Sequence, residues 1–194
     1  MNPDILNTIL PCLGGLLFCL GWVWLNKTED DEVLASHINE LQDKKVDTDL
    51  MGYKARGYLN ADQDNIPNTT VTKILLNAET YDPGDDFDAD GADSDYTAPV
   101  TGYYLIIGQI QWNATVANKL YRAYIYVNGA GKSMNIVQSA AVEKLTVPIS
   151  DILHVALGET IDLRGYHNAG AATPDVLGHA TGQSTYLIIH LLSI

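Results

Sequence analysis

From Ala55 to Ile194 the chain is a succession of short runs rich in β-branched and aromatic residues, separated by Gly, Pro, Asn and Asp. In the run 103–112 the even-numbered positions are mostly apolar, whereas Gln109 and Gln111 fall on the opposite face. This period of two is typical of a strand with one buried face. Similar runs lie at 71–76, 121–127, 136–139, 142–147, 152–155, 160–166 and 186–192. About eight to ten strands at this spacing predict an all-β fold, a two-sheet sandwich of the jelly-roll type.

Two local patterns refine this prediction. Asn128-Gly129 follows the alternating run 121–127 and predicts a tight hairpin, because these residue types tolerate the positive φ angles of such a turn. The final run, 186–192, is apolar on both faces. We therefore expect it to be central in a sheet or buried between subunits.

The segment from Ile5 to Leu25 carries no charge over 21 residues. As a helix it would extend about 31 Å, close to the roughly 30 Å hydrocarbon core of a bilayer. Trp22 and Trp24 suit the membrane interface near one end. An apolar assembly segment buried against partner subunits is the alternative. Residues 1–26 are thus predicted to be an N-terminal anchor or assembly segment.

Residues 27–54 are predicted to form a short helical connector. Leu34, Ile38 and Leu41 follow the 4-3 spacing of a coiled-coil seam, and the pattern is lost at Lys45. Such a short seam cannot hold an oligomer by itself. An amphipathic helix packed on its own domain fits the pattern equally well, and the strand-rich domain, 55–194, follows.

Charge and cysteine content exclude some classes of protein. The net charge is −13, and the eleven basic residues are spread along the chain, which argues against nucleic-acid binding because phosphate neutralisation needs clustered cations. The two cysteines, Cys12 and Cys19, both lie in the apolar N-terminal segment. The domain 55–194 therefore contains no disulfide of its own, and its stability must come from core packing, a metal or oligomerisation.

Seven aspartates crowd the segment 82–95. Asp86, Asp88 and Asp90 match the alternating carboxylates that open a calcium-binding loop. The twelfth position of that motif is Thr97 in place of the bidentate Glu. Calcium is thus a candidate cofactor with Asp86, Asp88 and Asp90 as its ligands, and a solvated acidic loop is the alternative.

No catalytic constellation is evident in the sequence. The five histidines lack metal-ligand spacing, and no G-x-S-x-G nucleophile motif occurs. The stretch 129–133 mimics the end of a phosphate-binding loop but lacks its first glycine, so a hairpin explains it better. A carbohydrate-processing enzyme on a jelly roll would need two carboxylates across a cleft, whereas these acidic residues crowd one loop. We predict that the protein is not an enzyme.

Several motifs together resemble the complement C1q-like globular head, a jelly roll of the tumour-necrosis-factor superfamily. The resemblance covers roughly residues 55–194 and is closer to bacterial and phage members. No collagen-like Gly-X-Y tract precedes it, so the complement role is not implied. The motifs are Tyr81, Gly84 and Phe87; Tyr96-Thr97-Ala98-Pro99; Gly102-Tyr103-Tyr104; Asn128-Gly129; Leu157-Gly158-Glu159-Thr160; and the terminal run 186–192.

The resemblance implies a ten-stranded type of jelly roll that forms a homotrimer around an apolar threefold axis. The residues expected at the trimer interface are Tyr186, Ile188, His190 and Leu192. The stretch 166–182 is rich in small and polar residues, and binding often resides on loops carried by a rigid scaffold. The residues expected to face a receptor are Tyr166, His167, Asn168 and His179.

These observations predict a structural or attachment protein. We expect a homotrimeric C1q-like head on the surface of a virion, as a phage spike or tail protein, that binds a host-surface glycan or protein. The N-terminal segment would hold it to other virion or envelope proteins, or contact a membrane. A membrane-anchored bacterial surface adhesin, displayed on the extracellular face of a cell envelope, is the alternative with the same order of domains.

Overall fold

The structure is a computed structural model that describes residues 52–89 and 93–194. These residues belong to one compact unit, Thr48–Ile194. The predicted anchor, residues 1–26, and nearly all of the predicted connector, residues 27–54, lie outside the described residues. In the part of the chain that is described, no helix has the length and apolar character needed to cross a bilayer.

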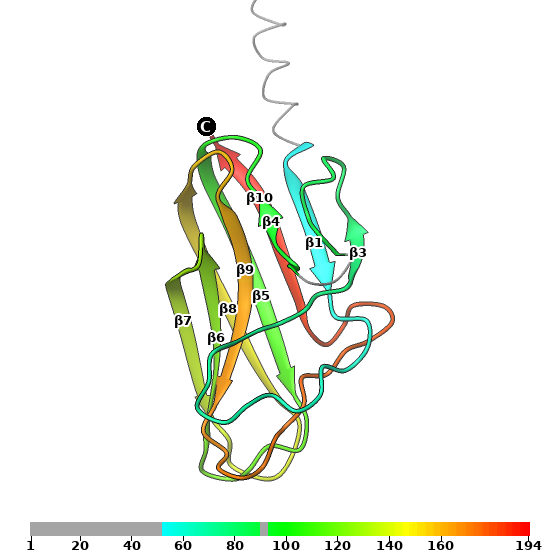
Figure 1. Cartoon of the computed structure of the whole chain (residues 1–194), viewed down its shortest axis with the longest axis vertical. Helices are drawn as coiled ribbons and strands as arrows, with labels where there is room; N and C mark the ends of the chain where they lie inside the picture. Colours follow the sequence, from blue (N-terminus) through cyan, green and yellow to red (C-terminus); the bar gives the residue numbers. More distant parts are fainter. Residues whose placement is uncertain (1–51, 90–92) are drawn as a thin grey trace, which may run out of the picture. The chain divides into compact units, whose positions relative to one another are not determined.

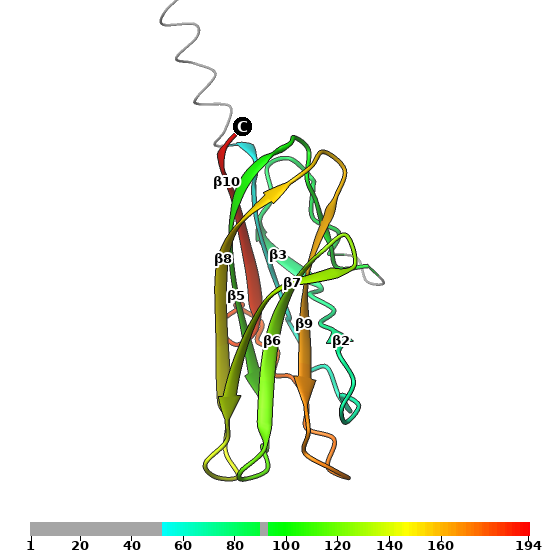
Figure 2. The same cartoon turned by 90° about the vertical axis from the view of Figure 1, so that its left-hand side faces the viewer.

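Two antiparallel sheets pack face to face (Figures 1 and 2). Sheet A has the order β3-β1-β10-β5-β8, and sheet B has the order β2-β9-β6-β7 with the short β4 paired to β9. The strands are β1 Lys54–Tyr58, β2 Thr72–Lys73, β3 Ala78–Tyr81, β4 Tyr96–Thr97, β5 Gly102–Trp112, β6 Leu120–Val127, β7 Ala130–Gln138, β8 Leu145–Val155, β9 Thr160–His167 and β10 Tyr186–Ser193. The predicted all-β jelly-roll sandwich is confirmed.

Strand β8 differs from the prediction. The sequence separates two runs, 142–147 and 152–155, whereas the structure has one strand, Leu145–Val155, that continues through Pro148. Proline lacks the N–H that a ladder needs, but β8 lies at the edge of sheet A, where such a residue is tolerated. Pairing with β5 along the whole of β8 overrides the break that proline suggests.

The hairpin between β6 and β7 is confirmed. Asn128 has a φ of 50° and Gly129 a φ of 75°, the left-handed values that a tight two-residue turn requires. The stretch 129–133 therefore serves as a turn and the start of β7, and no helix follows it as a phosphate-binding loop would require.

The core fills the space between the two sheets with the inward-facing side chains of both. Trp112 of β5 and Tyr121 of β6 are fully buried, with ring centroids 5.3 Å apart across the sandwich. Strand β10 contributes Leu187, Ile189 and Leu191, all buried. The strictly alternating burial of β5 and β6 is the period of two read from the sequence.

The first described strand and the last strand meet at one end of the sandwich. The N–H of Leu191 donates to the carbonyl of Tyr53 at 3.0 Å, immediately before β1. Figure 1 shows the C-terminus at this same end, whereas the turns between β5 and β6 and between β7 and β8 lie at the opposite end. Strand β1 therefore begins at the end that carries the C-terminus.

Truncation of a core residue tests this packing. Ile106→Ala removes a fully buried side chain of β5 and is expected to lower the free energy of unfolding by about 2–5 kcal/mol. Ile136→Ala on β7, where the side chain is 40% exposed, should cost less than about 1 kcal/mol. Urea denaturation measures both variants, and equal losses would contradict the assignment of Ile106 to the core.

Candidate assembly interface and acidic loop

The outer face of sheet A carries an apolar region on β10, β5 and β8, with Ser150 of β8 beside Ile107 as a polar interruption. On β10 it carries the residues expected at a trimer interface: Tyr186, Ile188 and His190 are half-buried, and Leu192 is 44% exposed beyond a register shift near the strand end. The alternate residues of β10 point into the core. Tyr186, Ile188 and His190 therefore lie along the side of β10 that faces away from the core, and Leu192 is exposed at the register shift between Leu191 and Ser193. The role of all four between subunits stays a prediction.

The apolar surface continues across the neighbouring strands. Ile188 pairs with Ile107 of β5, and Leu105 of β5 pairs with Ile152 of β8, which is 54% exposed. Tyr103 is 51% exposed, and its ring meets that of His154 edge-on at 5.1 Å. Exposed apolar side chains gathered on one face are more typical of an interaction surface than of a monomer's solvent-facing side.

Polar groups border this surface along β1. The Arg56 guanidinium lies 4.8 Å from the ring centroid of Tyr186, and it donates to the Gly182 carbonyl at 2.5 Å. At the other border, a groove of about 430 Å³ lies between β7 and the strands of sheet A, with Ser133, Pro148 and Tyr186 in its wall. An apolar centre with a polar rim is the usual anatomy of a protein interface.

The acidic loop follows β3 and is attached to sheet A by Phe87. The Phe87 ring is buried against Gly57 of β1, where a Cβ would overlap it. The Phe87 N–H donates to Asp82 Oδ2 at 2.7 Å, which closes a turn over residues 82–87. The carbonyl of Asp86 accepts from the N–H of Thr97 at 2.8 Å, so both sides of the loop are held together.

A cavity of about 630 Å³ opens among the carboxylates of this loop. Its lining includes Glu79, Asp85, Asp86 and Asp88. Burial raises the pKa of the Asp86 carboxyl, and the neighbouring carboxylates of Asp82 and Asp85 raise it further. The folded protein thus destabilises the ionised form of Asp86.

Two of the three predicted calcium ligands lie within the described residues. Asp86 and Asp88 line the cavity, and Asp90 lies outside the described residues. Among residues 52–89 and 93–194, no three His, Cys, Asp or Glu side chains are grouped as a metal ion requires. Calcium binding by Asp86, Asp88 and Asp90 stays a prediction.

The four residues expected to face a receptor do not form one surface. His167 is fully buried, stacked against Tyr121 at 6.0 Å, which corrects the expectation that it is accessible. Asn168 is half-buried, and its Oδ1 accepts from the N–H of Leu120 at 2.7 Å. Tyr166 lies on the outer face of β9, and His179 is exposed in the connection to β10.

His167 is held as a neutral ring by two backbone groups. Its Nε2 lies 2.8 Å from the Ile66 carbonyl, and its Nδ1 lies 3.2 Å from the N–H of Ala169. These partners fit a ring that donates from Nε2 and accepts at Nδ1. Burial lowers the pKa of His167, although the hydrogen bond to Ile66 acts in the opposite direction.

Comparison with known proteins gives a fold and no closer relationship. No protein-family model matches the chain, and no curated protein matches its sequence. Its structure is similar to the Eiger TNF of S. frugiperda, with a TM-score of 0.55 and 11% identity over 72% of this chain and 92% of that one. The chain has the fold of tumour-necrosis-factor and C1q domains.

Two further structures support this assignment. The globular domain of zebrafish complement 1qA protein has a TM-score of 0.54 and 12% identity, over 72% of this chain and 97% of that one. Murine APRIL, at pH 5.0, has a TM-score of 0.52 and 13% identity, over 72% of this chain and 98% of that one. The predicted C1q- and tumour-necrosis-factor-like fold is thereby confirmed.

One group of surface residues was not identified as a candidate site from the sequence. Arg122, Tyr124 and Tyr126 alternate along β6 on the face opposite the core. Arg164 and Tyr166 lie beside them on β9, in register. The alternation places each residue on an outer face, but the pairing of β6 with β9 in this TNF- and C1q-like sandwich is what brings them together.

The raised pKa of Asp86 predicts how the melting temperature of the protein depends on this side chain. An acid with a raised folded-state pKa destabilises the native protein once the pH rises above its ordinary value, 3.8 for Asp86. Asp86→Asn should therefore raise the melting temperature at pH 7 in EDTA, and the gain should vanish near pH 3. Differential scanning calorimetry measures it, with the exposed Asp64→Asn as the control.

A lower melting temperature for Asp86→Asn than for the wild type in EDTA would contradict this interpretation. Repeating both measurements with calcium distinguishes a calcium site from a solvated acidic loop. If Asp86 binds calcium, Asp86→Asn should lower the melting temperature relative to the wild type when calcium is present, but not in EDTA.

The lowered pKa of His167 predicts a second dependence of stability on pH. A lowered histidine pKa means that stability is complete above the ordinary value of 6.5 and is lost as the pH falls below it. The free energy of unfolding should fall there by at most about 1.4 kcal/mol per pH unit for one proton. Urea denaturation between pH 7.5 and pH 5 measures this slope.

His167→Gln should be less stable overall but should lose this slope, whereas His179→Gln, changed at the surface, should keep it. A slope unchanged in His167→Gln would show that another group is responsible.

Proposed function

We propose that the protein is a non-enzymatic homotrimeric attachment head that assembles through the outer face of sheet A. The observation that carries the proposal is the contiguous apolar surface of β5, β10 and β8. Strand β10 is central in sheet A and yet is apolar on the side away from the core. Burial of such a surface against copies of the same chain is its simplest use.

Three copies are proposed because the C1q resemblance implies a threefold arrangement. The exposed residues Tyr103, Ile152 and Leu192 are each large enough to supply strong apolar contacts when removed from water. The histidines His154 and His190 lie within the same face and would sit among these contacts.

Display on a virion surface is part of the proposal, and the positions of the strand ends are compatible with it. Strand β1 begins at the end of the sandwich that carries the C-terminus (Figure 1). If the N-terminal segment holds the head to other virion proteins, the turns at the opposite end face outward, toward a host-surface glycan or protein. Three heads on one particle raise the overall affinity for such a ligand through avidity.

A membrane-anchored bacterial adhesin is the second candidate. The observation that favours it is the uncharged segment Ile5–Leu25, which is long enough to span a bilayer. The proposed head and its assembly are the same in both cases.

The assembly is tested by a charge placed in the proposed interface. The segment 48–194 contains the whole described core, so it is expected to fold alone. Light scattering at micromolar concentration should give a trimer for this segment and a folded monomer for Ile188→Glu. A buried unpaired charge costs several kcal/mol at each of the three interfaces.

Ile136→Glu on the outer face of sheet B is the control and should remain trimeric. A wild-type monomer, or a trimer that survives Ile188→Glu, would overturn the proposed interface.

A further inference from the structure

The outer face of sheet B carries an alternating ladder of arginine and tyrosine. On β6 and β9, Tyr124 pairs with Arg164 and Arg122 pairs with Tyr166 in the strand register. The guanidinium of Arg122 lies 4.7 Å from the ring centroid of Tyr166, and that of Arg164 lies 4.0 Å from the ring centroid of Tyr126. Each cation therefore covers an aromatic face, an arrangement that orients the planar guanidinium.

The two arginines differ in their carboxylate partners. Arg164 binds Asp162 with two hydrogen bonds of 2.6 and 2.9 Å, and Asp162 is buried. Arg122 donates from Nη1 to the Tyr124 hydroxyl at 3.0 Å. Within residues 52–89 and 93–194, Arg122 has no carboxylate at ion-pair distance, and its Nε is enclosed without an acceptor. Arg122 is thus a positioned cation without a carboxylate partner, and because its Nε is enclosed, its terminal Nη groups are the ones that a ligand could reach.

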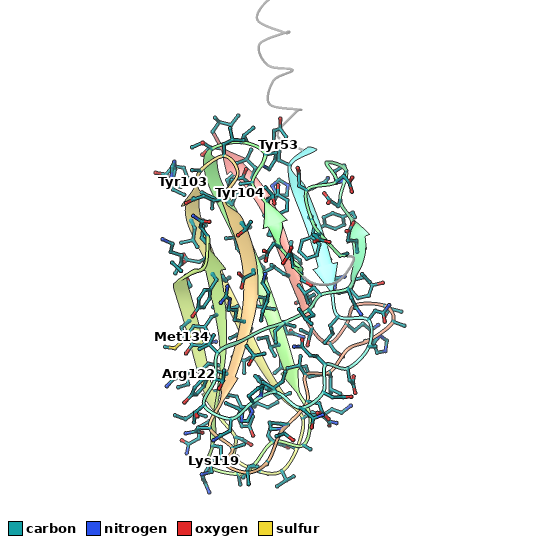
Figure 3. The ribbon with its side chains drawn as sticks, in the orientation of Figure 1. Tyr53, Tyr103, Tyr104, Lys119, Arg122 and Met134 are labelled. Carbon is teal, nitrogen blue, oxygen red and sulfur yellow. The ribbon has the colours of Figure 1, made fainter. Side chains whose placement is uncertain are left out.

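The surroundings of Arg122 are apolar and accessible. Ile136 of β7 pairs with Arg122 and is 40% exposed. Met134 pairs with Tyr124 and is also exposed. Figure 3 shows Arg122 and Met134 at one margin of the sandwich, with Tyr103 further toward the end that carries the C-terminus. The face therefore offers one cation set among aromatic and apolar side chains.

Charge on this face is opposite to that of the whole protein. The outward positions of β2, β9 and β6 carry Lys73, Arg164 and Arg122. Lys73 is paired with Asp95 at 2.5 Å and Arg164 with Asp162 at 2.6 Å, so among these three cations Arg122 is the one without a carboxylate partner in the described residues. The chain as a whole has a net charge of −13. One uncompensated cation on an otherwise acidic protein favours a ligand with a single negative charge at this point.

We propose that the Arg122 face of sheet B binds a carboxylate-bearing saccharide. Arg122 would bind the carboxylate through its guanidinium, and the apolar face of a sugar ring would lie against Tyr166 and Ile136. This inference rests on the proposed attachment role and specifies its ligand as an acidic glycan.

A saccharide fits this face better than an acidic peptide. A peptide with several carboxylates would meet a single unpaired arginine and, elsewhere on the chain, many like charges. A glycan needs one carboxylate for each several sugar units, and its rings present apolar C–H faces with polar edges. Tyrosine and arginine side chains match both, since each joins a flat apolar surface to a hydrogen-bond donor.

The full chain, kept in a detergent without a sugar headgroup, tests the proposal by isothermal titration. 3′-Sialyllactose and a hyaluronan hexasaccharide supply sialic and uronic carboxylates, lactose is the neutral probe, and hexaglutamate is the peptide probe. At least one acidic saccharide should bind tenfold or more tightly than lactose and hexaglutamate. Arg122→Gln should weaken that binding at least tenfold.

Two further variants test whether binding requires the guanidinium of Arg122 or only a positive charge. Arg122→Lys keeps the charge but not the planar fork and should recover only part of the affinity. Lys144→Gln removes one exposed cation of the β7–β8 turn and should bind as the wild type does. Matching thermal unfolding curves for the variants exclude a loss of fold as the cause.

Failure of both acidic saccharides to bind, equal binding of lactose, stronger binding of hexaglutamate, or binding that is unchanged in Arg122→Gln would each overturn the proposal. Light scattering on the same samples separates this outcome from the proposed assembly. A trimer that binds no saccharide contradicts only the ligand, whereas a monomer contradicts the assembly through sheet A.

Discussion

The pairing of β10 between β1 and β5 is the interaction on which the rest of the structure depends. It joins the first described strand to the last, because Lys54 pairs with His190 across nearly the whole domain. On one side β10 supplies Leu187 and Ile189 to the core, and on the other it exposes the apolar surface proposed for assembly. Sheet A is incomplete until this C-terminal strand is in place. A contact of such long sequence separation carries a large loop-closure entropy and is expected to form late in folding.

The position of the acidic loop depends indirectly on the pairing of β1 with β10. Phe87 packs on Gly57, and Gly57 is held in β1 by its pairing with Leu187 of β10. The aromatic ring therefore provides the apolar attachment that keeps several mutually repelling carboxylates close to the sheet. Because Asp86 is partly withdrawn from water as a result, the loop is destabilised at neutral pH by the position that the fold gives it.

The sequence predicts those features that are set by local pattern. The alternation in 103–112 and 121–127, the positive φ angles of Asn128-Gly129 and the doubly apolar final strand all follow from residues within a few positions of one another. Strand β1, with the sequence KARGY, carries no such pattern and is a strand because β10 and β3 pair with it. His167 was expected at the surface because it lies among polar and small residues. Its ring is buried against Trp112 and Tyr121, and its Nε2 lies 2.8 Å from the Ile66 carbonyl, 101 positions away; no local pattern contains these contacts.

The outer faces of the two sheets differ in how their side chains are satisfied, and this difference separates their proposed roles. On sheet B the arginines stack on tyrosines, and Asp162 neutralises Arg164. Most polar side chains of this face therefore already have interaction partners within the monomer. Such a face gains little from association with a like copy but can accept a small anionic ligand. On sheet A, Ile188 pairs with Ile107 and Leu105 with Ile152, yet Ile152 stays 54% exposed, so removal from water would stabilise these side chains further. Association of acidic copies also requires an apolar gain that exceeds their mutual repulsion, and sheet A is the face with the contiguous surface to supply it.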